Sequence, residues 1–364
     1  MDRKKTSEPV RAALLALLRG GLWEQDVKPH SCFPLSRDGW EEVFLLSKQQ
    51  TVTGVAFRGL HHLPDGMLPP ESLLLRWMAA ADGIERKNKE MNLALDSLLT
   101  LFARHGLHPI LQKGQGLASL YAYPLLRECG DIDLYFVDEK EFESASDSIQ
   151  AQGIRLVRKA DGSLMYSWHG VPVEHHIRLV DLYHPHHRYP KTGSAWGFRD
   201  TVLPAASGLR VTVPTPSLNL LLQYAHILKH ALGRGIGLRQ LCDLALSCDK
   251  WHTEVHPAIL REACRQSGLG KWVPLLHTFL TDCLGLAPDR LPYPEAAPDA
   301  RPLLDIIWRG GNFGQQKGSP SVQPVMLRKV QTADAFRRNL CFALHYAPKE
   351  AFGLFTNLLK GQAR

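Results

Sequence analysis

Apolar residues recur at helical spacing through the first 106 residues of the chain. Leu74, Met78, Ala81 and Ile84 mark one face of a long segment that a Pro-Pro pair precedes and Gly106 follows. Proline before a helix and glycine after it are typical boundary residues. This pattern predicts a helical N-terminal region, with helices from Val10 to Leu18, Gly39 to Leu60 and Glu71 to His105.

The apolar period changes to that of strands at His108. Two short helices, from Leu117 to Tyr123 and from Glu139 to Gln152, interrupt the strand-like runs. The stretch from Val180 to Leu209 is rich in His, Pro and Gly and is expected to be a long surface loop. The predicted strands run from His108 to Gln112, Gly130 to Val137, Ile154 to Lys159, Leu164 to Trp168 and Val171 to Leu179.

Helical periodicity returns at Ser217, after Pro214 and Pro216. The order of elements predicts an α+β protein in three parts. These are a helical N-terminal region over residues 1–106, an α/β core over 107–213 and a helical C-terminal domain over 214–364. The C-terminal helices are expected at Ser217 to Leu232, Leu238 to Cys248, His256 to Ser267, Val273 to Cys283, Ala333 to Tyr346 and Lys349 to Leu359.

Two acids interrupt the predicted strand from Gly130 to Val137. Side chains alternate along a strand, so Asp131 and Asp133 leave the same face with Cα atoms roughly 6.5 Å apart. A divalent ion would relieve their repulsion, whereas two hydrated acids at a strand end would explain the same motif. Glu174 could add a third carboxylate, because alternation places it on one face of its strand with His176.

The turn after the first predicted strand offers a site for an anion. Lys113 precedes Gly114, Gln115 and Gly116 at the start of a short helix, where backbone N–H groups point outward. The turn only superficially resembles a dinucleotide-binding fingerprint, because Ser119 occupies the third glycine position. A P-loop is excluded, because no Gly-Lys-Ser/Thr sequence is present.

Composition narrows the possible partners. The net charge of +7 favours an anionic ligand, but the 43 basic and 36 acidic residues are interspersed, which gives no strong signal for nucleic acid. No apolar stretch approaches the roughly 18 residues needed to span a bilayer. The seven cysteines are scattered and contain no Cys-x-x-Cys pair, so we expect reduced, buried thiols in a cytoplasmic protein.

The motifs together resemble a known family. Lys113-Gly114, Tyr123-Pro124, Arg127, the Asp131-Ile132-Asp133 strand and the later Glu174-x-His176 are similar to the bacterial putative nucleotidyltransferase family of the polymerase-β-like nucleotidyltransferase superfamily. The resemblance covers roughly residues 100 to 250. Within it, two pairs are similar to the family's second motif: His226 with His230 and Arg239 with Asp243.

The resemblance implies a nucleotidyltransferase-type mixed β-sheet core with flanking helices. Asp131, Asp133 and Glu174 would be catalytic and hold Mg²⁺ or Mn²⁺, with Glu174 standing where the family often has Asp. The turn from Lys113 to Gly116 would face a nucleoside triphosphate, and Arg127 would help to neutralise its phosphates. His176 would belong to the site, and His226, His230 and Arg239 would face the cleft.

The expected reaction is metal-dependent transfer of a nucleoside monophosphate from the triphosphate to an acceptor hydroxyl, with release of pyrophosphate. The sequence leaves the nucleotide and the acceptor open, and the acceptor could be a small molecule, a saccharide, a peptide or a protein. Two alternatives remain. One is a nucleotide-binding pseudoenzyme of the same fold, and the other is a metal-dependent phosphodiesterase.

Several polar residues also have simpler explanations. His226 and His230 have a zinc-ligand spacing but lack the glutamate of a metalloprotease helix. Arg239 and Asp243 are most simply an i, i+4 ion pair, although they could also join the helical domain to the core. Outside His176, solvated side chains explain the cluster of His169, His175, His184, His186 and His187 better than zinc, and a plain turn explains the loop from Gly311 to Gly314 as well as a functional one.

Overall fold

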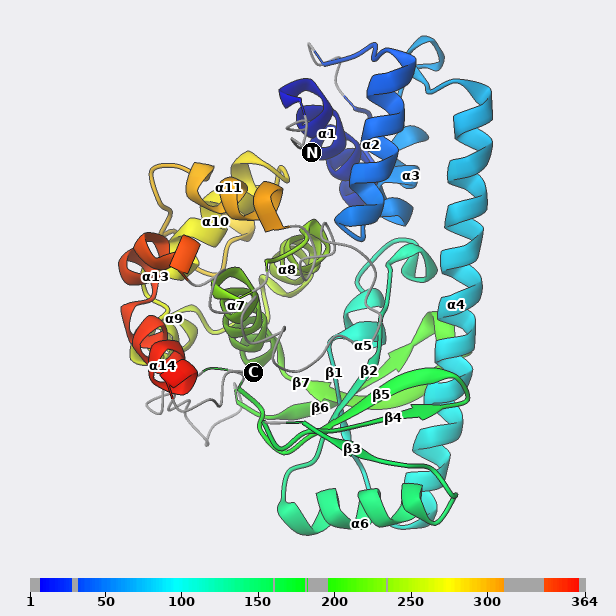
Figure 1. Ribbon diagram of the computed structural model, residues 1–364, viewed down its shortest axis with the longest axis vertical. Coiled ribbons are helices and arrows are strands. Elements are labelled where there is room, and N and C mark those ends of the chain that lie inside the picture. The colour runs from blue at the N-terminus through cyan, green and yellow to red at the C-terminus, as the bar shows by residue number, and fades with distance from the viewer. Residues whose placement is uncertain are drawn as a thin grey trace.

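The computed structural model describes residues 7–27, 32–159, 161–180, 182, 196–233, 235–310 and 337–359. Figure 1 shows a β-sheet in the lower half of the molecule and helices from both ends of the chain above and beside it. One long helix, α4 (Glu71–Arg104), runs along both parts. The architecture is α+β, with a seven-stranded mixed sheet flanked by helices, as the sequence predicts.

Three short helices form the N-terminal group: α1 (Glu8–Trp23), α2 (Arg37–Gln49) and α3 (Thr53–Leu60). The prediction of one helix from Gly39 to Leu60 was wrong, because the backbone leaves the helical conformation between α2 and α3. Thr51 has a φ of 52°, in the left-handed region that ends a right-handed helix. The start of α2 is capped by Ser36, whose hydroxyl accepts a hydrogen bond from the Gly39 N–H.

Helices α1 and α3 approach each other closely at two glycines. A Cβ atom at Gly59 would lie 2.0 Å from the carbonyl oxygen of Leu17, and one at Gly21 would lie 2.1 Å from that of Val55. No side chain fits at either position without a backbone shift. The glycines therefore set the distance between the two helices.

Gly59→Ala is expected to lower the free energy of unfolding by about 1–3 kcal/mol, because the two helices must separate to admit the methyl group. Urea denaturation measures this change. Gly83→Ala, on α4, is the matched control, because its added Cβ would meet only the Arg86 guanidinium, at 3.9 Å. It should be stabilising by about 0.5–1 kcal/mol, and equal effects in the two variants would contradict the close-contact explanation.

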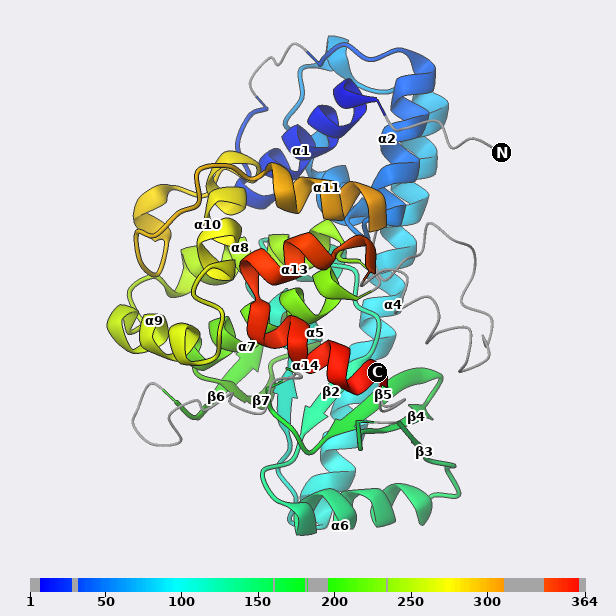
Figure 2. The ribbon, with the colours of Figure 1, turned by 60° about the vertical axis from the view of Figure 1, so that its left-hand side comes forward.

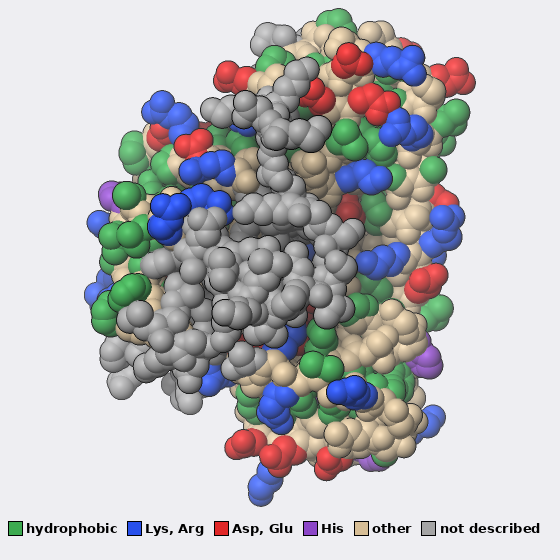
Figure 3. Space-filling view, viewed as in Figure 1, with side chains coloured by type: hydrophobic (Ala, Val, Ile, Leu, Met, Phe, Trp, Pro, Cys, Tyr) green, Lys and Arg blue, Asp and Glu red, His purple; other side chains and the backbone are tan. Residues whose placement is uncertain are grey.

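Helix α4 connects the two halves of the molecule. Trp77, in its first half, is buried among the N-terminal helices, while Met91 and Phe102, in its second half, pack on the sheet. The charged stretch from Glu85 to Glu90 continues the helix without a break, and Glu85 pairs with Lys89 at 3.7 Å. Basic and acidic side chains are interspersed along the face of α4 visible in Figure 3, as expected for a solvated helix face.

The strand order in the sheet is β3-β4-β5-β2-β1-β7-β6. Strand β2 pairs in parallel with β5, and β1 pairs in parallel with β7, while the other neighbours are antiparallel. The strands are β1 (Ile110–Gln112), β2 (Ile132–Tyr135), β3 (Val157–Arg158), β4 (Leu164–Trp168), β5 (Val171–His176), β6 (Phe198–Leu203) and β7 (Leu209–Pro214).

Two local predictions need correction. The expected loop from Val180 to Leu209 contains strand β6, which forms a hairpin with β7. The alternating residues of β6 had been interpreted as loop, and β7, which begins at Leu209, had not been predicted. The helix expected from Leu117 to Tyr123 is α5 (Gly114–Ala118), followed by the single turn η2 (Pro124–Leu126). The Gly114–Gly116 segment therefore belongs to a helix and not to the turn before it.

The two faces of the sheet have different neighbours. Ile132, Leu134 and Phe136 are buried in a core that includes Phe142 and Ile149 of α6 (Glu139–Gln150) and the second half of α4. Asp133 and Tyr135 alternate with these residues and leave the opposite face. Tyr135 belongs to the second core, which the sheet shares with the remaining helices.

The C-terminal helices pack beside this second face (Figure 2). They share one hydrophobic core with α1 to α3, and the Trp23 indole donates a hydrogen bond to the Leu284 carbonyl at 2.6 Å. The division of the chain at residues 107 and 214 stays a prediction. The helices are α7 (Pro216–Leu232), α8 (Leu238–Trp251), α9 (Pro257–Gln266), α10 (Trp272–Asp282), α11 (Arg301–Gly310), α13 (Leu340–Tyr346) and α14 (Pro348–Leu359), of which α11 was not predicted.

The cysteines are free thiols, and six of them are buried as expected. Cys341 differs from that expectation, because it is exposed on α13. Within the ranges that the structure describes, no helix is long and apolar enough to cross a membrane.

Candidate active site

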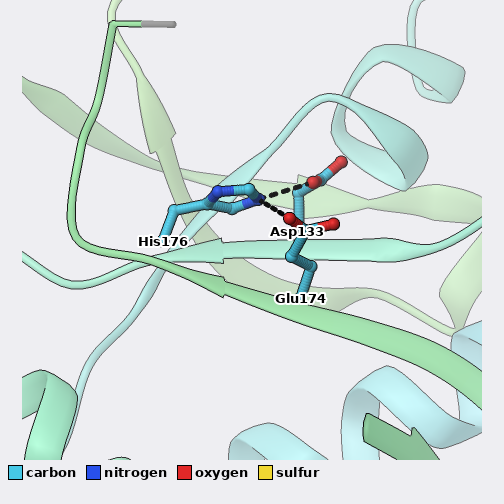
Figure 4. A group of neighbouring side chains, drawn as sticks. All are labelled: Asp133, Glu174 and His176. Atoms are coloured by element: carbon cyan, nitrogen blue, oxygen red, sulfur yellow. Dashed lines mark hydrogen bonds and ion pairs between the residues drawn. The ribbon is translucent and has the colours of Figure 1, made fainter. Parts of the chain in front are cut away.

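Two acids and a histidine meet on the face of the sheet opposite α4 and α6. Asp133 of β2 and Glu174 of β5 are direct partners in the parallel pairing, which confirms that the Glu174 strand neighbours the acidic strand. His176 lies two residues after Glu174, and its Nε2 is 2.8 Å from Asp133 Oδ1 and 3.9 Å from Glu174 Oε1. Figure 4 shows the imidazole directed at both carboxylates.

The three side chains form a group that could hold a metal ion. One ligand atom from each residue lies within 4.8 Å of the other two, a spacing that one cation could bridge. Asp133 and Glu174 are both largely buried. Buried carboxylates are costly unless they are paired with cations.

Asp131 lies just before β2, outside this group of three, and it is exposed to solvent. It nevertheless interacts electrostatically with the site. The Asp133 carboxylate first, and then desolvation of its own carboxyl, raise the pKa of Asp131 to about 6. Asp131, the first acid of the predicted pair, is therefore close to Asp133 and Glu174, while His176 is the residue that contacts both of these carboxylates.

Cations compensate the charge of Asp133. Burial alone would raise its pKa, but nearby Lys113, the hydrogen bond with His176 and the charge of Lys159 together hold the pKa of Asp133 well below its usual value. The Lys113 Nζ lies 3.8 Å from Asp133 Oδ1. At neutral pH Asp133 is therefore ionised.

The backbone at Lys113 is strained. Lys113 has φ 50° and ψ −140°, and Gly114 has φ 44°. Positive φ is rare for a residue with a side chain, and such strain tends to occur at functional sites. A Cβ atom at Gly114 would lie 3.4 Å from the Asp131 carbonyl oxygen, so glycine allows the turn to pack against the acidic strand.

Gln112 and Gln115 flank the strained turn and are both buried. Gln112 pairs with Asp133 across β1 and β2, so its side chain leaves the same face. Gln115 points into a small cavity that Asn88, Asn92 and Ser119 also line. Gln112 was not predicted from the sequence to lie beside Asp133. Its position at the end of a predicted strand next to the acidic strand could have indicated this.

Lys159 and Ser163 are two further site residues that the sequence did not single out. The Lys159 Nζ lies 2.5 Å from Glu174 Oε2, and the Ser163 hydroxyl donates a hydrogen bond to Glu174 Oε1 at 2.9 Å. Both residues belong to the turn between β3 and β4. The available signal was the Asp161-Gly162 turn, which returns the chain beside the Glu174 strand.

Arg127 occupies a different position from the one expected. Its guanidinium forms two hydrogen bonds with the buried Asp243 carboxylate, at 2.6 and 2.9 Å, and the Tyr121 hydroxyl donates to the same carboxylate at 2.7 Å. Both ionic partners are almost fully buried. Arg127 therefore joins the segment before β2 to helix α8, and its donors point to protein groups.

The predicted ion pair between Arg239 and Asp243 was wrong, because Asp243 pairs with Arg127. The Arg239 Nη1 instead donates a hydrogen bond to the carbonyl of Glu128 at 2.7 Å. The physical reason is that the buried Arg127 guanidinium takes the Asp243 carboxylate, while Arg239 contacts the backbone of the adjacent Glu128. Both still connect α8 to the core, which was the second interpretation of this motif.

His226 and His230 lie on α7 with their ring centroids 4.4 Å apart. Burial, followed by the positive charge of Lys113, lowers the pKa of His226 well below its usual value. The charge of Lys113 therefore acts on the His226 imidazole. Of the other histidines, His169 is exposed between β4 and β5 and His175 is buried, while His184, His186, His187 and the loop from Gly311 to Gly314 lie outside the described residues.

A family model described as an uncharacterised nucleotidyltransferase matches residues 36–285, more than half of the chain. The chain belongs to this nucleotidyltransferase family. The match includes the acidic strand, the Lys113 turn, Glu174 and the α8 contacts, and the family implies a nucleoside triphosphate substrate. Searches among curated proteins and among solved structures gave no match.

Proposed function

We propose that this protein is a metal-dependent nucleotidyltransferase of the polymerase-β-like superfamily. It would transfer a nucleoside monophosphate from a triphosphate to an acceptor hydroxyl. The observation that carries the proposal is the direct pairing of Asp133 with Glu174, with His176 in contact with both. Family membership supports the same class of reaction.

The residues present fit a divalent cation. Asp133 and Glu174 offer hard carboxylate oxygens of the kind that Mg²⁺ and Mn²⁺ prefer, and His176 offers a nitrogen that Mn²⁺ accepts more readily. Asp131 adds a further carboxylate beside them. A bound cation would neutralise charge on the phosphates and on the acceptor oxygen. Its identity, Mg²⁺ or Mn²⁺, is part of the proposal.

The residues around the acids would contact different parts of the nucleotide. Lys113 would contact the phosphate oxygens, because its ammonium stands beside Asp133 at the strained turn and remains partly exposed. The N–H groups of Gly114, Gln115 and Gly116 would support the same anion. His226, His230 and Arg239 would contact the nucleotide from α7 and α8, because their positive or neutral side chains accept it better than acids would.

In the proposed reaction, a bond forms between the acceptor oxygen and the α-phosphorus. The bond from that phosphorus to the bridging oxygen breaks, and pyrophosphate leaves with the bonding electrons. The hydroxyl proton passes to a carboxylate of the site. The acceptor remains a small molecule, a saccharide, a peptide or a protein.

A labelling experiment tests this function. The protein is incubated with Mg²⁺ or Mn²⁺, cell extract and each α-labelled nucleoside triphosphate in turn. We expect label to enter an acceptor together with release of pyrophosphate, and Asp131→Ala to abolish both. Equal labelling by Asp131→Ala would contradict the assignment. Nucleotide binding without pyrophosphate release would indicate a pseudoenzyme, and hydrolysis of a generic phosphodiester would indicate a phosphodiesterase.

A further inference from the structure

Glu174 has an ammonium group closer to its carboxylate than the 3.8 Å that separates Lys113 from Asp133. Lys159 Nζ lies 2.5 Å from Glu174 Oε2. Its side chain is 38% exposed, whereas that of Glu174 is 12% exposed. The lysine therefore approaches the buried carboxylate from the solvent side, and it can leave without opening the core.

The neighbouring residue leaves the opposite face of the sheet. The Arg158 guanidinium lies over the Phe142 ring of α6, 6.0 Å from its centroid, which is the face covered by helices. Strand alternation then places Lys159 on the face of Asp133 and Glu174. Arg158 and Lys159 thus provide adjacent positive charges, one outside the site and one within it.

The orientation of Glu174 does not depend on the lysine alone. The Ser163 hydroxyl lies 2.9 Å from Oε1 and 2.7 Å from Asp161 Oδ1, and its single proton can be donated to either carboxylate. If Lys159 moved away, the Ser163 hydroxyl would still lie within hydrogen-bond distance of the carboxylate. The geometry thus separates a contact that positions Glu174 from a contact that neutralises it.

The charge balance indicates when the lysine would move. Asp131, Asp133 and Glu174 carry three negative charges at most, and Lys113 and Lys159 supply two positive ones. A divalent cation added to this nearly balanced site would be repelled by an ammonium in contact with the same carboxylate. A triphosphate brings several negative charges that could accept that ammonium.

We propose that Lys159 is an exchangeable counter-ion, which neutralises Glu174 when the site holds no metal and transfers to a phosphate oxygen of the nucleotide when metal and nucleotide bind together. This inference rests on the proposed function. Lys159 thereby makes metal binding depend on the nucleotide. It is a nucleotide-binding residue that neither the sequence motifs nor the family resemblance assigned.

The test measures Mn²⁺ binding by the electron paramagnetic resonance of free Mn²⁺. Titrations are made with the full chain alone and with each of the four ribonucleoside α,β-methylene triphosphates, which cannot release pyrophosphate. In Lys159→Met, Mn²⁺ alone should bind roughly tenfold more tightly than in the wild-type protein, because one repelling charge is gone. The best-binding analogue should bind roughly tenfold more weakly in the presence of Mn²⁺.

Two variants control for folding and for charge. Arg158→Met removes the adjacent charge and should change neither affinity, and Lys159→Arg should restore most of the nucleotide affinity. If wild-type protein binds Mn²⁺ with an analogue, but Lys159→Met behaves like Arg158→Met, only the role of Lys159 is overturned. If the wild-type protein binds no Mn²⁺ with any analogue, the proposed metal centre is overturned and the role of Lys159 with it.

Discussion

Asp133→Asn is expected to lower nucleotidyl transfer by at least about 1,000-fold while leaving the fold intact. Asp133 is the acid that contacts both His176 and Lys113, and it pairs with Glu174 in the sheet. Asparagine has the same shape but no charge, so it cannot hold a cation or balance Lys113. Losses of this size are typical when a group that stabilises transition-state charge is removed. Pyrophosphate release under saturating nucleotide measures the change.

The same substitution gives a second readout at Asp131. The Asp133 carboxylate is the main reason why the pKa of Asp131 is raised, so Asp133→Asn should lower the pKa of Asp131 toward its ordinary value of about 4. Carboxyl-detected NMR titration of the metal-free protein shows this shift. Glu143→Gln, an exposed acid on α6, should leave both the activity and the titration unchanged. Full activity in Asp133→Asn would remove this residue from the mechanism.

The acidic site was largely predictable from local pattern. Alternation along two strands placed Asp131 with Asp133 and Glu174 with His176, and the structure pairs Asp133 directly with Glu174. The pattern could not show which basic side chains neutralise these acids. Lys159 reaches Glu174 of β5 from the turn that follows β3, two strands away in the sheet order β3-β4-β5. The hydrophobic periodicity of a single strand does not predict the order of strands in the sheet, so it could not predict this contact.

Arg127 is a second residue whose partner local sequence pattern could not predict. Beside an acidic strand, an arginine favours a phosphate-binding interpretation, and Asp243 had a nearer potential partner in Arg239 at helical spacing. Burial decided otherwise, because an arginine that is 4% exposed requires a carboxylate within the core. The partner lies 116 residues away in the sequence. The fold brings Arg127 and Asp243 together, and helical periodicity cannot predict a contact over that separation.

The missed elements have a different cause. Strand β6 alternates polar and apolar residues, as in Thr201-Val202, but the His, Pro and Gly content of the stretch from Val180 to Leu209 favoured a loop. The prediction gave the amino-acid composition of this stretch more weight than its alternation of apolar and polar residues. In contrast, α4 was predicted within one residue at its C-terminal end, because proline before it and glycine after it agree with a long apolar stripe.

Asp243→Asn is expected to lower the free energy of unfolding by about 3–5 kcal/mol. The substitution leaves the Arg127 guanidinium buried beside a neutral amide, and an uncompensated buried charge costs far more than the net value of the original pair. The carboxylate also accepts the Tyr121 hydroxyl, so three donors lose charge-assisted hydrogen bonds at once. Urea denaturation followed by tryptophan fluorescence measures the loss.

A double variant separates the charge from the packing. Arg127→Met with Asp243→Leu removes both charges and should recover much of the loss of Asp243→Asn, because no unpaired ion remains in the core. Lys89→Met, which breaks the exposed pair with Glu85, should cost no more than about 0.5 kcal/mol. If Asp243→Asn costs as little as Lys89→Met, Arg127 is not held as a buried ion, and its guanidinium would again be available to a phosphate. The stability of this one pair therefore decides whether Arg127 joins α8 to the core or belongs to the nucleotide site.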